Sequence, residues 1–359
     1  MVNLRGCGAG KVIGLPDLAD RLILRDVRVL SNFLRRDDGS DPGPAVEYRL
    51  ARPEEVEPAL AMILGPAGAA ASREQITDFL EFASLRRIKV EETWVASAGG
   101  RLAWAVLPIL SPGHTALLFT PAKRPDGIDL APLLDLVCAE LLSRQVQLAQ
   151  ALLDPDDADT RAFFAARQFR EMAQLLYLQT MTPRQLAPLS PPDSFWWRTY
   201  SADTHPLFER AILETYQQSL DCPALNGLRS IDDVIAGHKA SGEFNPRFWY
   251  VLSERDNPVG VLLLSHVPRT DMAELVYLGL APAARRRGLA DLLMRHALWA
   301  VREMGLTRLT LAVDSQNAPA LRLYYRHGLQ RIGSKIAVMK EVRGLPSADL
   351  RVPDEGSAE

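Results

Sequence analysis

The sequence is poor in cysteine, with only Cys7, Cys138 and Cys222 among its 359 residues. This odd number at wide spacing provides neither a disulfide framework nor a zinc-binding pattern. The histidines are equally scattered and show no ligand spacing, so no metal site is expected. Such sparse cysteine usage favours a reducing compartment, and we expect the protein to reside in the cytoplasm.

Long apolar runs and an excess of basic charge are also missing. No stretch of about 18 or more uninterrupted apolar residues occurs, and the first residues lack the apolar core of a signal peptide, so we expect neither a membrane span nor secretion. The 41 basic residues are outnumbered by 44 acidic ones. Because binding to a phosphate backbone needs a broad basic surface, nucleic acid is not an expected partner.

What is present is the composition of a globular protein, with 47% hydrophobic and 24% charged residues. At roughly 150 residues per domain, the length favours two domains. The stretches "RRDDGSDPGP" and "MTPRQLAPLSPPDS" are rich in glycine or proline and predict breaks between structured parts. The predicted division is a leader at 1–45, a first domain at 46–182, a linker at 183–194, a second domain at 195–342 and a tail at 343–359.

The second half has a readable order of elements. The stretches "FWYVLSE", "NPVGVLLLSHV" and "AELVYLGLA" predict three strands. Apolar residues at helical spacing follow Gly288, then "TRLTLAVD" alternates as a strand, and "APALRLYYRHG" returns to a helix that ends at Gly328. A strand, helix, strand unit favours parallel pairing of the two strands with a right-handed crossover.

Three adjacent arginines lie where the third of these strands gives way to a helix. A helix N-terminus leaves backbone N–H groups unpaired and carries partial positive charge, so it can bind an anion such as phosphate. Gly288 lets the backbone approach a ligand, Ala290 keeps the first turn small, and Arg285, Arg286 and Arg287 add charged donors. The alternative is a solvated basic turn that merely begins a helix.

The surrounding stretch "LGLAPAARRRGLA" resembles the acyl-CoA-binding signature R-x-x-G-x-A of the GNAT N-acetyltransferase superfamily, at Arg285, Gly288 and Ala290. "NAPALRLYYRHGL" is similar to a second signature of that family, N-x-x-A-x-x-L-Y-x-x-x-G-[FL], from Asn317 to Leu329. The resemblance implies an α/β (α+β) architecture of two tandem GNAT folds. Each would have a mixed, largely antiparallel central sheet flanked by helices, with a splayed parallel strand pair at the acyl-CoA site.

The resemblance also implies the cofactor acetyl-CoA and the residues that bind it. Backbone groups of the strand end would pair with pantetheine, and the arginine turn would surround the pyrophosphate. Asn317 would contact pantetheine, although asparagine before Ala-Pro is also a common helix cap. The expected cofactor-binding residues are Leu278, Gly279, Leu280, Arg285, Arg286, Arg287, Gly288, Leu289, Ala290, Asp291 and Asn317.

Two side chains are candidates for the chemistry. Glu274, at the start of "AELVYLGLA", resembles the general-base glutamate of some family members, and burial could raise its pKa into the working range. Tyr324 matches the motif tyrosine whose phenol can protonate the coenzyme thiolate, and Tyr325 is the neighbour with which it could be confused. The alternatives are an ordinary strand-end carboxylate and a packed helix aromatic. His296 is expected to be a packing residue.

The expected function is N-acetyl transfer from acetyl-CoA to a primary amine by direct attack in a ternary complex, with the C-terminal domain catalytic. A different class of function, a non-catalytic acyl-CoA sensor or scaffold, remains open. The acceptor would be a small-molecule or peptide amine, and the acidic residues Asp221, Asp232, Asp233 and Glu243 would suit a cationic one. The sequence does not indicate an oligomeric state.

The first half resembles a degenerate repeat of the second. Setting "TPAKRPDGID" beneath "APAARRRGLA" pairs Arg124 with Arg285 and Gly127 with Gly288, at a constant shift of 161 positions. In the first copy proline and aspartate replace two arginines, and Asp129 replaces Ala290. The same shift sets Asp156 against Asn317, Phe163 against Tyr324 and Gly113 against Glu274. We therefore expect a tandem protein whose first domain is structural or shapes the substrate site, an arrangement that resembles the mycothiol synthase-like acetyltransferases.

Overall fold

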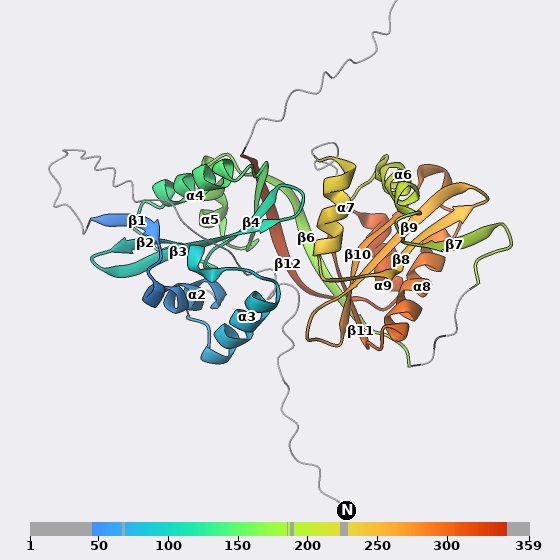
Figure 1. Ribbon diagram of the computed structural model, residues 1–359, viewed down its shortest axis with the longest axis horizontal. Coiled ribbons are helices and arrows are strands. Elements are labelled where there is room, and N and C mark those ends of the chain that lie inside the picture. The colour runs from blue at the N-terminus through green and yellow to red at the C-terminus, as the bar shows by residue number, and fades with distance from the viewer. Residues whose placement is uncertain (1–44, 67–68, 185, 187–189, 223–228, 343–359) are drawn as a thin grey trace, which may run out of the picture.

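A computed structural model describes residues 45–66, 69–184, 186, 190–222 and 229–342. The predicted tail, almost all of the predicted leader, and Cys7 lie outside these residues. Figure 1 shows two lobes with two long strands running between them. No helix among the described residues has the length and apolar character needed to cross a bilayer.

The first half is a succession of strands and helices. Its strands and α-helices are β1 (Val46–Leu50), α2 (Val56–Leu64), α3 (Arg73–Leu85), β2 (Trp94–Ala98), β3 (Arg101–Ser111), β4 (Thr115–Phe119), α4 (Ala131–Ser143), β5 (Leu148–Leu153), α5 (Ala158–Ala166) and β6 (Arg170–Met181).

The second half repeats that order, and the strands and helices predicted for it are confirmed. Its elements are β7 (Phe195–Thr199), α6 (His205–Tyr216), α7 (Ile231–Ala240), β8 (Glu243–Glu254), β9 (Asn257–His266), β10 (Met272–Leu280), α8 (Leu289–Glu303), β11 (Arg308–Asp314), α9 (Ala318–Arg326) and β12 (Gln330–Glu341). The expected α/β architecture with two similar halves is thus present.

Backbone conformation shows which residues of the two halves correspond. Gly127 and Gly288 both have left-handed φ angles, 72° and 79°, at a shift of 161 positions. Beyond the next helix the shift becomes 160, because Gln168 (φ 68°) corresponds to Gly328 (φ 80°). The first half therefore has one extra residue between Gly127 and the end of α4.

This extra residue corrects two of the pairings expected from a constant shift. Asp157, not Asp156, corresponds to Asn317, since each is the N-cap of its helix and accepts a hydrogen bond from the backbone three residues on. By the same helix alignment Phe164, not Phe163, corresponds to Tyr324. Sequence overlay missed the slip because the matched residues, Arg124 and Gly127, all lie before it.

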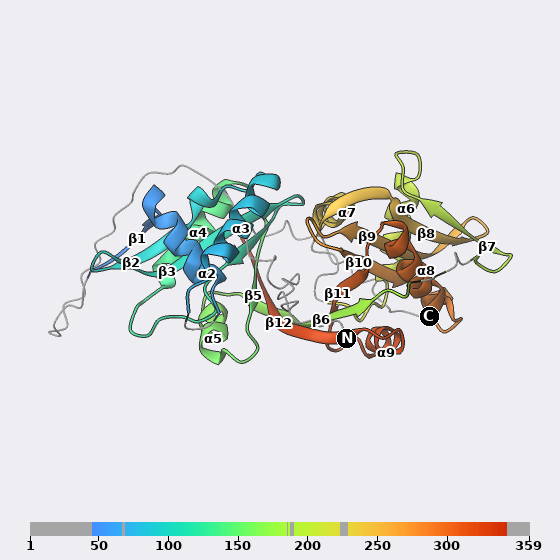
Figure 2. The ribbon, with the colours of Figure 1, turned by 90° about the horizontal axis from the view of Figure 1, so that it is seen from below.

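The strands form one sheet of twelve, in the order β1-β2-β3-β4-β5-β12-β6-β11-β10-β9-β8-β7. Each half inserts its last strand into the other: β12 lies between β5 and β6, and β6 lies between β12 and β11. Figure 1 shows both strands passing between the lobes, and Figure 2 shows β12 running from the first half to α9. The expected first domain, 46–182, thus contains a strand whose hydrogen-bonding neighbours both belong to the second half.

Helices cover both faces of the second half's sheet. Alternate residues of β9 point to opposite sides: Leu262 and Leu264 pack with α8, whereas Val261 and Leu263 pack with α6 and α7. The amphipathic α8 buries Leu293, Met294, Ala297 and Val301 against the sheet, as its apolar spacing predicts. These two layers hold β10 in place between them.

Candidate functional site

The sheet opens between β10 and β11. The two strands are parallel and pair only over the first three residues of β10, ending at the pair Glu274 and Thr310. Beyond that point β10 stays hydrogen-bonded to β9 as far as Leu280, with a bulge between Leu275 and Tyr277. The splayed parallel pair expected from the sequence is therefore present, and one backbone edge of β10 faces a gap.

A cavity of about 410 Å³ fills this gap. Its walls come from the splayed part of β10, the arginine turn, β11, α9 and the segment after α6. Of the side chains and backbone groups predicted to bind a cofactor, it brings together Leu278, Gly279, Leu280, Arg285, Arg286, Ala290 and Asn317, and it adds Tyr324.

The arginine turn has free donors beside the cavity, which Arg286 and Ala290 line, whereas Gly288 does not. Gly288 is the N-cap of α8 and needs its left-handed φ, which L side chains rarely adopt. Within the described residues, none of the backbone N–H groups from Arg286 to Ala290 donates a hydrogen bond, and the Arg286 guanidinium has no partner. Five unpaired N–H groups at a helix N-terminus beside a cation make an anion site.

The other two arginines of the turn are engaged elsewhere. Arg285 lines the cavity, yet four of its five N–H donors bond backbone carbonyls, those of Leu280, Thr215, Gln217 and Gln218. It thereby ties the C-terminal end of α6 to the end of β10. Arg287 forms a two-pronged ion pair with Glu254, at 2.6 and 2.8 Å, and does not line the cavity.

The side chains of two further predicted cofactor-binding residues, Leu289 and Asp291, also point away from the cavity. The side chain of Leu289 is buried in an apolar cluster with Phe195 and Leu252, away from the cavity. The carboxylate of Asp291 pairs with Arg326 at 2.7 Å and with His327 at 3.0 Å, which joins the start of α8 to the end of α9. Only the backbone of these two residues remains near the turn.

Asn317 combines both roles considered for it. Its Oδ1 accepts a hydrogen bond from the Ala320 N–H at 3.3 Å, so it caps α9, and it also lines the cavity. Its amide group faces Asp221, whose pKa is raised mainly by burial and also by the nearby Asp314. Asp221 lines the cavity and comes from the segment after α6.

Tyr324 and Tyr325 are clearly separated by the structure. Tyr324 is 7% exposed and lines the cavity, whereas Tyr325 is 48% exposed on the other side of α9. Burial raises the pKa of the Tyr324 phenol well above its usual value. The motif tyrosine is therefore held protonated at the cavity wall, which suits a proton donor.

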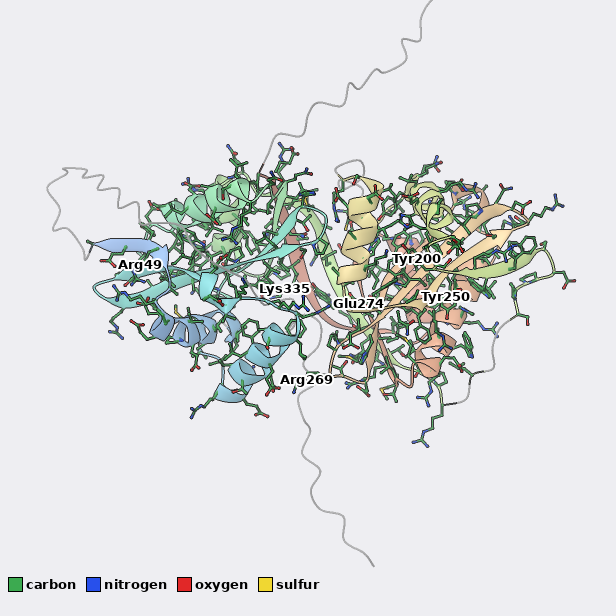
Figure 3. The ribbon with its side chains drawn as sticks, in the orientation of Figure 1. Arg49, Tyr200, Tyr250, Arg269, Glu274 and Lys335 are labelled. Carbon is green, nitrogen blue, oxygen red and sulfur yellow. The ribbon has the colours of Figure 1, made fainter. Side chains whose placement is uncertain are left out.

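Glu274 occupies the point where β10 and β11 separate. Its cross-strand neighbours are Ser265 and Thr310, both about 1% exposed. Its Oε2 is buried and has no hydrogen-bond partner among the described residues, and burial raises the pKa of the carboxyl group to about 8. A carboxyl group with this proton affinity can accept a proton near neutral pH. Figure 3 shows Glu274 where the two lobes meet.

Several residues of the site were not singled out from the sequence. Thr215 on α6 hydrogen-bonds the Tyr277 hydroxyl at 2.9 Å, and both line the cavity. These two side chains lie so close to Gly279 that a Cβ there would collide with them. Thr215 lies about sixty residues before β10 in the chain, so spacing within a motif could not identify it.

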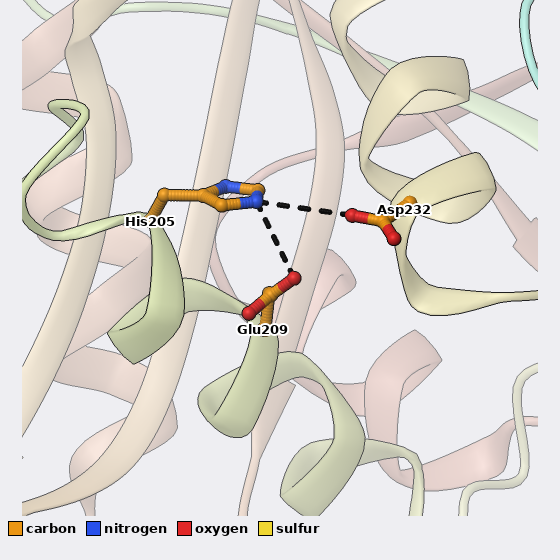
Figure 4. A group of neighbouring side chains, drawn as sticks. All are labelled: His205, Glu209 and Asp232. Atoms are coloured by element: carbon orange, nitrogen blue, oxygen red, sulfur yellow. Dashed lines mark ion pairs between the residues drawn. The ribbon is translucent and has the colours of Figure 1, made fainter.

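The structure also assembles a histidine–carboxylate group that the sequence did not suggest. His205 and Glu209, one turn apart on α6, meet Asp232 of α7, with His205 Nε2 at 3.3 and 3.9 Å from the two carboxylates (Figure 4). The Lys239 ammonium donates to the Tyr200 hydroxyl, which lies 2.9 Å from His205 Nδ1. That order of donors leaves a proton on Nε2 facing the carboxylates, so ordinary polar contacts account for the group without a metal.

His296 is the packing residue that the sequence predicted. It is 5% exposed and stacks on Trp197 with ring centroids 4.1 Å apart. Neither ring nitrogen has a hydrogen-bond partner among the described residues, and burial lowers its pKa to about 4. The ring is thus held neutral and outside the cavity.

Comparison with known proteins adds an independent line of evidence. Residues 212–329 match the acetyltransferase (GNAT) family. The mycothiol acetyltransferase of Thermomonospora curvata is 30% identical over 179 residues, which cover 49% of this chain and 58% of that protein, so less than two thirds of the relative is matched.

Two solved structures share the fold. A GCN5-related N-acetyltransferase from Sphaerobacter thermophilus has a TM-score of 0.56 at 17% identity, over 83% of this chain and 96% of that one. A GCN5-related glucosamine N-acetyltransferase region of a fungal multi-domain β-N-acetylglucosaminidase has a TM-score of 0.53 at 17% identity, over 85% of this chain and 39% of that one.

Proposed function

We propose that this chain, whose residues 212–329 match the GNAT acetyltransferase family, is an acetyl-CoA-dependent N-acetyltransferase whose second domain, 195–342, is catalytic. The observation that carries the proposal is the cavity between the splayed strands. It ends at the arginine turn, where the backbone N–H groups from Arg286 to Ala290 donate no hydrogen bond among the described residues. The first domain, 46–182, would support and shape that site.

The chain's own groups would hold the coenzyme along the length of the cavity. The free backbone edge of β10 at Leu278–Leu280 suits an amide-bearing pantetheine arm, and the donors from Arg286 to Ala290 suit a pyrophosphate. Asn317 adds an amide at the cavity wall. When bound, the coenzyme supplies an acetyl thioester. Arg285, Leu289 and Asp291 would hold the turn in shape, and Arg287 would fix its outer side.

The proposed catalytic roles are supported by the raised pKa values of Glu274 and Tyr324 together with the family motifs. Glu274, with a pKa of about 8, would accept the proton that a primary amine must lose before its nitrogen can attack a carbonyl carbon. Tyr324, whose pKa is raised by burial, would keep a proton on its phenol oxygen for the sulfur that departs as the C–S bond breaks. The attacking nitrogen would lose its second proton as the amide forms, and that proton would restore the Tyr324 phenol, so transfer would be direct, in a ternary complex.

The acceptor is proposed only as a class, a small-molecule or peptide amine. Asp221 at the cavity wall supports a cationic acceptor, whereas Glu243 is paired with His266 and Asp232 belongs to the His205 group. Since the curated relative is named a mycothiol acetyltransferase, mycothiol-related amines belong in the panel to be tested. The widely spaced free cysteines, Cys138 and Cys222, support a reducing compartment such as the cytoplasm.

The test is thiol release from acetyl-CoA over a panel of amines, together with calorimetry of coenzyme binding. Tyr324→Phe should lower kcat by about 10²–10⁴-fold, because it removes the proposed acid. Tyr325→Phe is the matched control and should stay within about twofold, since that ring lies outside the cavity.

Two results would count against this proposal. If acetyl-CoA binds but no amine accelerates thiol release, a coenzyme sensor replaces the enzyme. If the coenzyme does not saturate the folded protein at about millimolar concentration, a range above ordinary KM values, the cavity has been assigned to the wrong ligand.

A further inference from the structure

The first half of the chain reaches the second at the side where Glu274 lies. Helix α3 provides two contacts there. Arg86, the C-cap of α3, donates to the carbonyls of Ala240 and Gly242 at 3.2 and 3.0 Å, and Glu81 pairs with Arg269. Figure 3 shows Arg269 beside the lower end of the first lobe, next to the second. One helix thus links the halves at two separate points.

The Arg86 contact lies directly over the surroundings of Glu274. Gly242, which accepts one of the two hydrogen bonds, packs so closely on Ser265 that an added Cβ would come within 2.5 Å of its Oγ. Ser265 is in turn the cross-strand neighbour of Glu274 on β9. Residues directly opposite on neighbouring strands point to the same face of a sheet, so Arg86, Ser265 and Glu274 share one face.

The charges around this contact are few. The positive charge of Arg86 lowers the pKa of the Glu274 carboxyl group. The negative charges of Glu274 and Glu243 in turn raise the pKa of Arg86, against the larger effect of burial. Glu243 is already paired with His266, at 2.7 Å, and Arg269 with Glu81. Among the described residues, therefore, the cation whose charge affects the pKa of the proposed base comes from the other half of the chain.

We propose that Arg86 is a positioning residue for Glu274, through which the first half of the chain governs the proton-accepting step of the second. The inference rests on the proposed function for its meaning in catalysis. Arg86 fixes the end of α7 against the sheet through its two hydrogen bonds, and a cation at the C-terminal end of a helix is favourable there.

The charge of Arg86 also offsets part of the effect of burial. Burial raises the pKa of Glu274 to about 8, and Arg86 acts in the opposite direction. Without that cation the carboxylate would accept its proton even more tightly, and a smaller fraction would be ionised at neutral pH. The first half would thus keep the base usable without touching either substrate.

The titration of Glu274 can be followed without any activity. A carboxyl group whose folded pKa is raised stabilises the folded chain below the unfolded pKa, and this contribution is lost as pH rises towards the folded pKa. The free energy of unfolding, measured against that of Glu274→Gln from pH 4 to 10, should fall with pH and level off above about 8. When Arg86→Met is added to both the natural chain and Glu274→Gln, the pH at which this difference levels off should rise by about one pH unit.

Two variants separate charge from mere contact. Arg86→Lys keeps the cation and should leave the levelling point close to that of the natural chain. Glu81→Gln breaks the other α3 contact without changing the charge near Glu274, and it should leave the point unchanged. If an active amine is found, the rise of kcat/KM with pH should move in parallel for Arg86→Met alone.

Two outcomes would overturn the proposal: a levelling point that Arg86→Met does not move, or an equal shift in Glu81→Gln. Absence of amine-dependent activity in the natural chain would refute the proposed function instead, because the stability titration still decides the role of Arg86. If Arg86→Met fails to fold, Arg86→Gln with Arg86→Lys gives the same comparison.

Discussion

The two halves of this chain share an order of elements but differ at the turn that precedes their central helix. In the second half α8 begins immediately after Gly288 with free backbone donors. In the first half α4 begins only at Ala131, and the carboxylate of Asp129 accepts its N–H at 3.0 Å. The same fold therefore offers an anion site in one copy and a helix end capped by its own side chain in the other.

The strands differ in the same sense. β4 has five residues, and four of them pair with β5, so little of it splays. The first half has a cavity of about 330 Å³ beside the corresponding turn at Lys123–Gly127, but no residue of β4 or β5 lines it, and Arg124 lies 4.2 Å over the Phe163 ring at its wall. The two halves therefore differ in the length of the unpaired strand end and in the residue that precedes the helix, and only the second has a cavity between its parallel strands among the described residues.

The largest expected effect comes from separating the halves. The fragment 195–342 should fail to fold cooperatively, because both neighbours of β12 and one neighbour of β11 lie in 46–182. Circular dichroism, thermal unfolding and gel filtration of the fragment, beside the fragment 46–342, would check this. A monomeric 195–342 with a cooperative transition would show that the shared strands are dispensable.

A smaller effect is expected from giving the second turn the residue of the first. Ala290→Asp places a carboxylate in the first turn of α8, whereas Asp129 lies just before α4, and it should weaken coenzyme binding about 10–100-fold by repelling phosphate. Helix stability should be kept, since aspartate is favourable in a first turn. Calorimetry with coenzyme A measures the loss.

The reciprocal change provides the control for that experiment. Asp129→Ala in the first half should leave coenzyme affinity and stoichiometry unchanged. Unaltered affinity in Ala290→Asp, or a second coenzyme bound after Asp129→Ala, would break the comparison between the two turns.

The smallest effect concerns the core helices. His296 on α8 corresponds by helix ends to Leu136 on α4. Its lowered pKa means that stability is complete above the unfolded pKa of about 6.5 and is lost as pH falls towards about 4. His296→Leu should therefore change stability little at pH 7 and raise it, relative to the natural chain, at pH 5. Thermal melts at both pH values test this, and an equal change at both would mean that the ring takes up its proton at the same pH in the folded and the unfolded chain.

Much of the second half was accessible from sequence, because its signals are local. The strands, the helix after Gly288 and the signature tyrosine all depend on spacing within a few residues, and the structure places Tyr324 at the cavity as the motif predicts. The splayed strand pair likewise follows from the family resemblance.

What sequence could not provide depends on contacts between distant segments. The three arginines of the turn cannot be told apart from the sequence. In the structure Arg285 donates to carbonyls after α6 and Arg287 pairs with Glu254, so that Arg286 alone keeps its guanidinium donors free among the described residues of the turn. The exchange of β6 and β12 was equally hidden, since a strand pattern does not reveal its neighbours. The role of Arg86 combines both difficulties, because its partners lie more than 150 residues away.

The position of β12 has a consequence for how the protein is made. This strand is the last described element of the chain, yet it borders β5, so the first lobe has an open edge until residues 330–341 leave the ribosome. We therefore expect the earlier lobe to complete its sheet only after the later segment has been made.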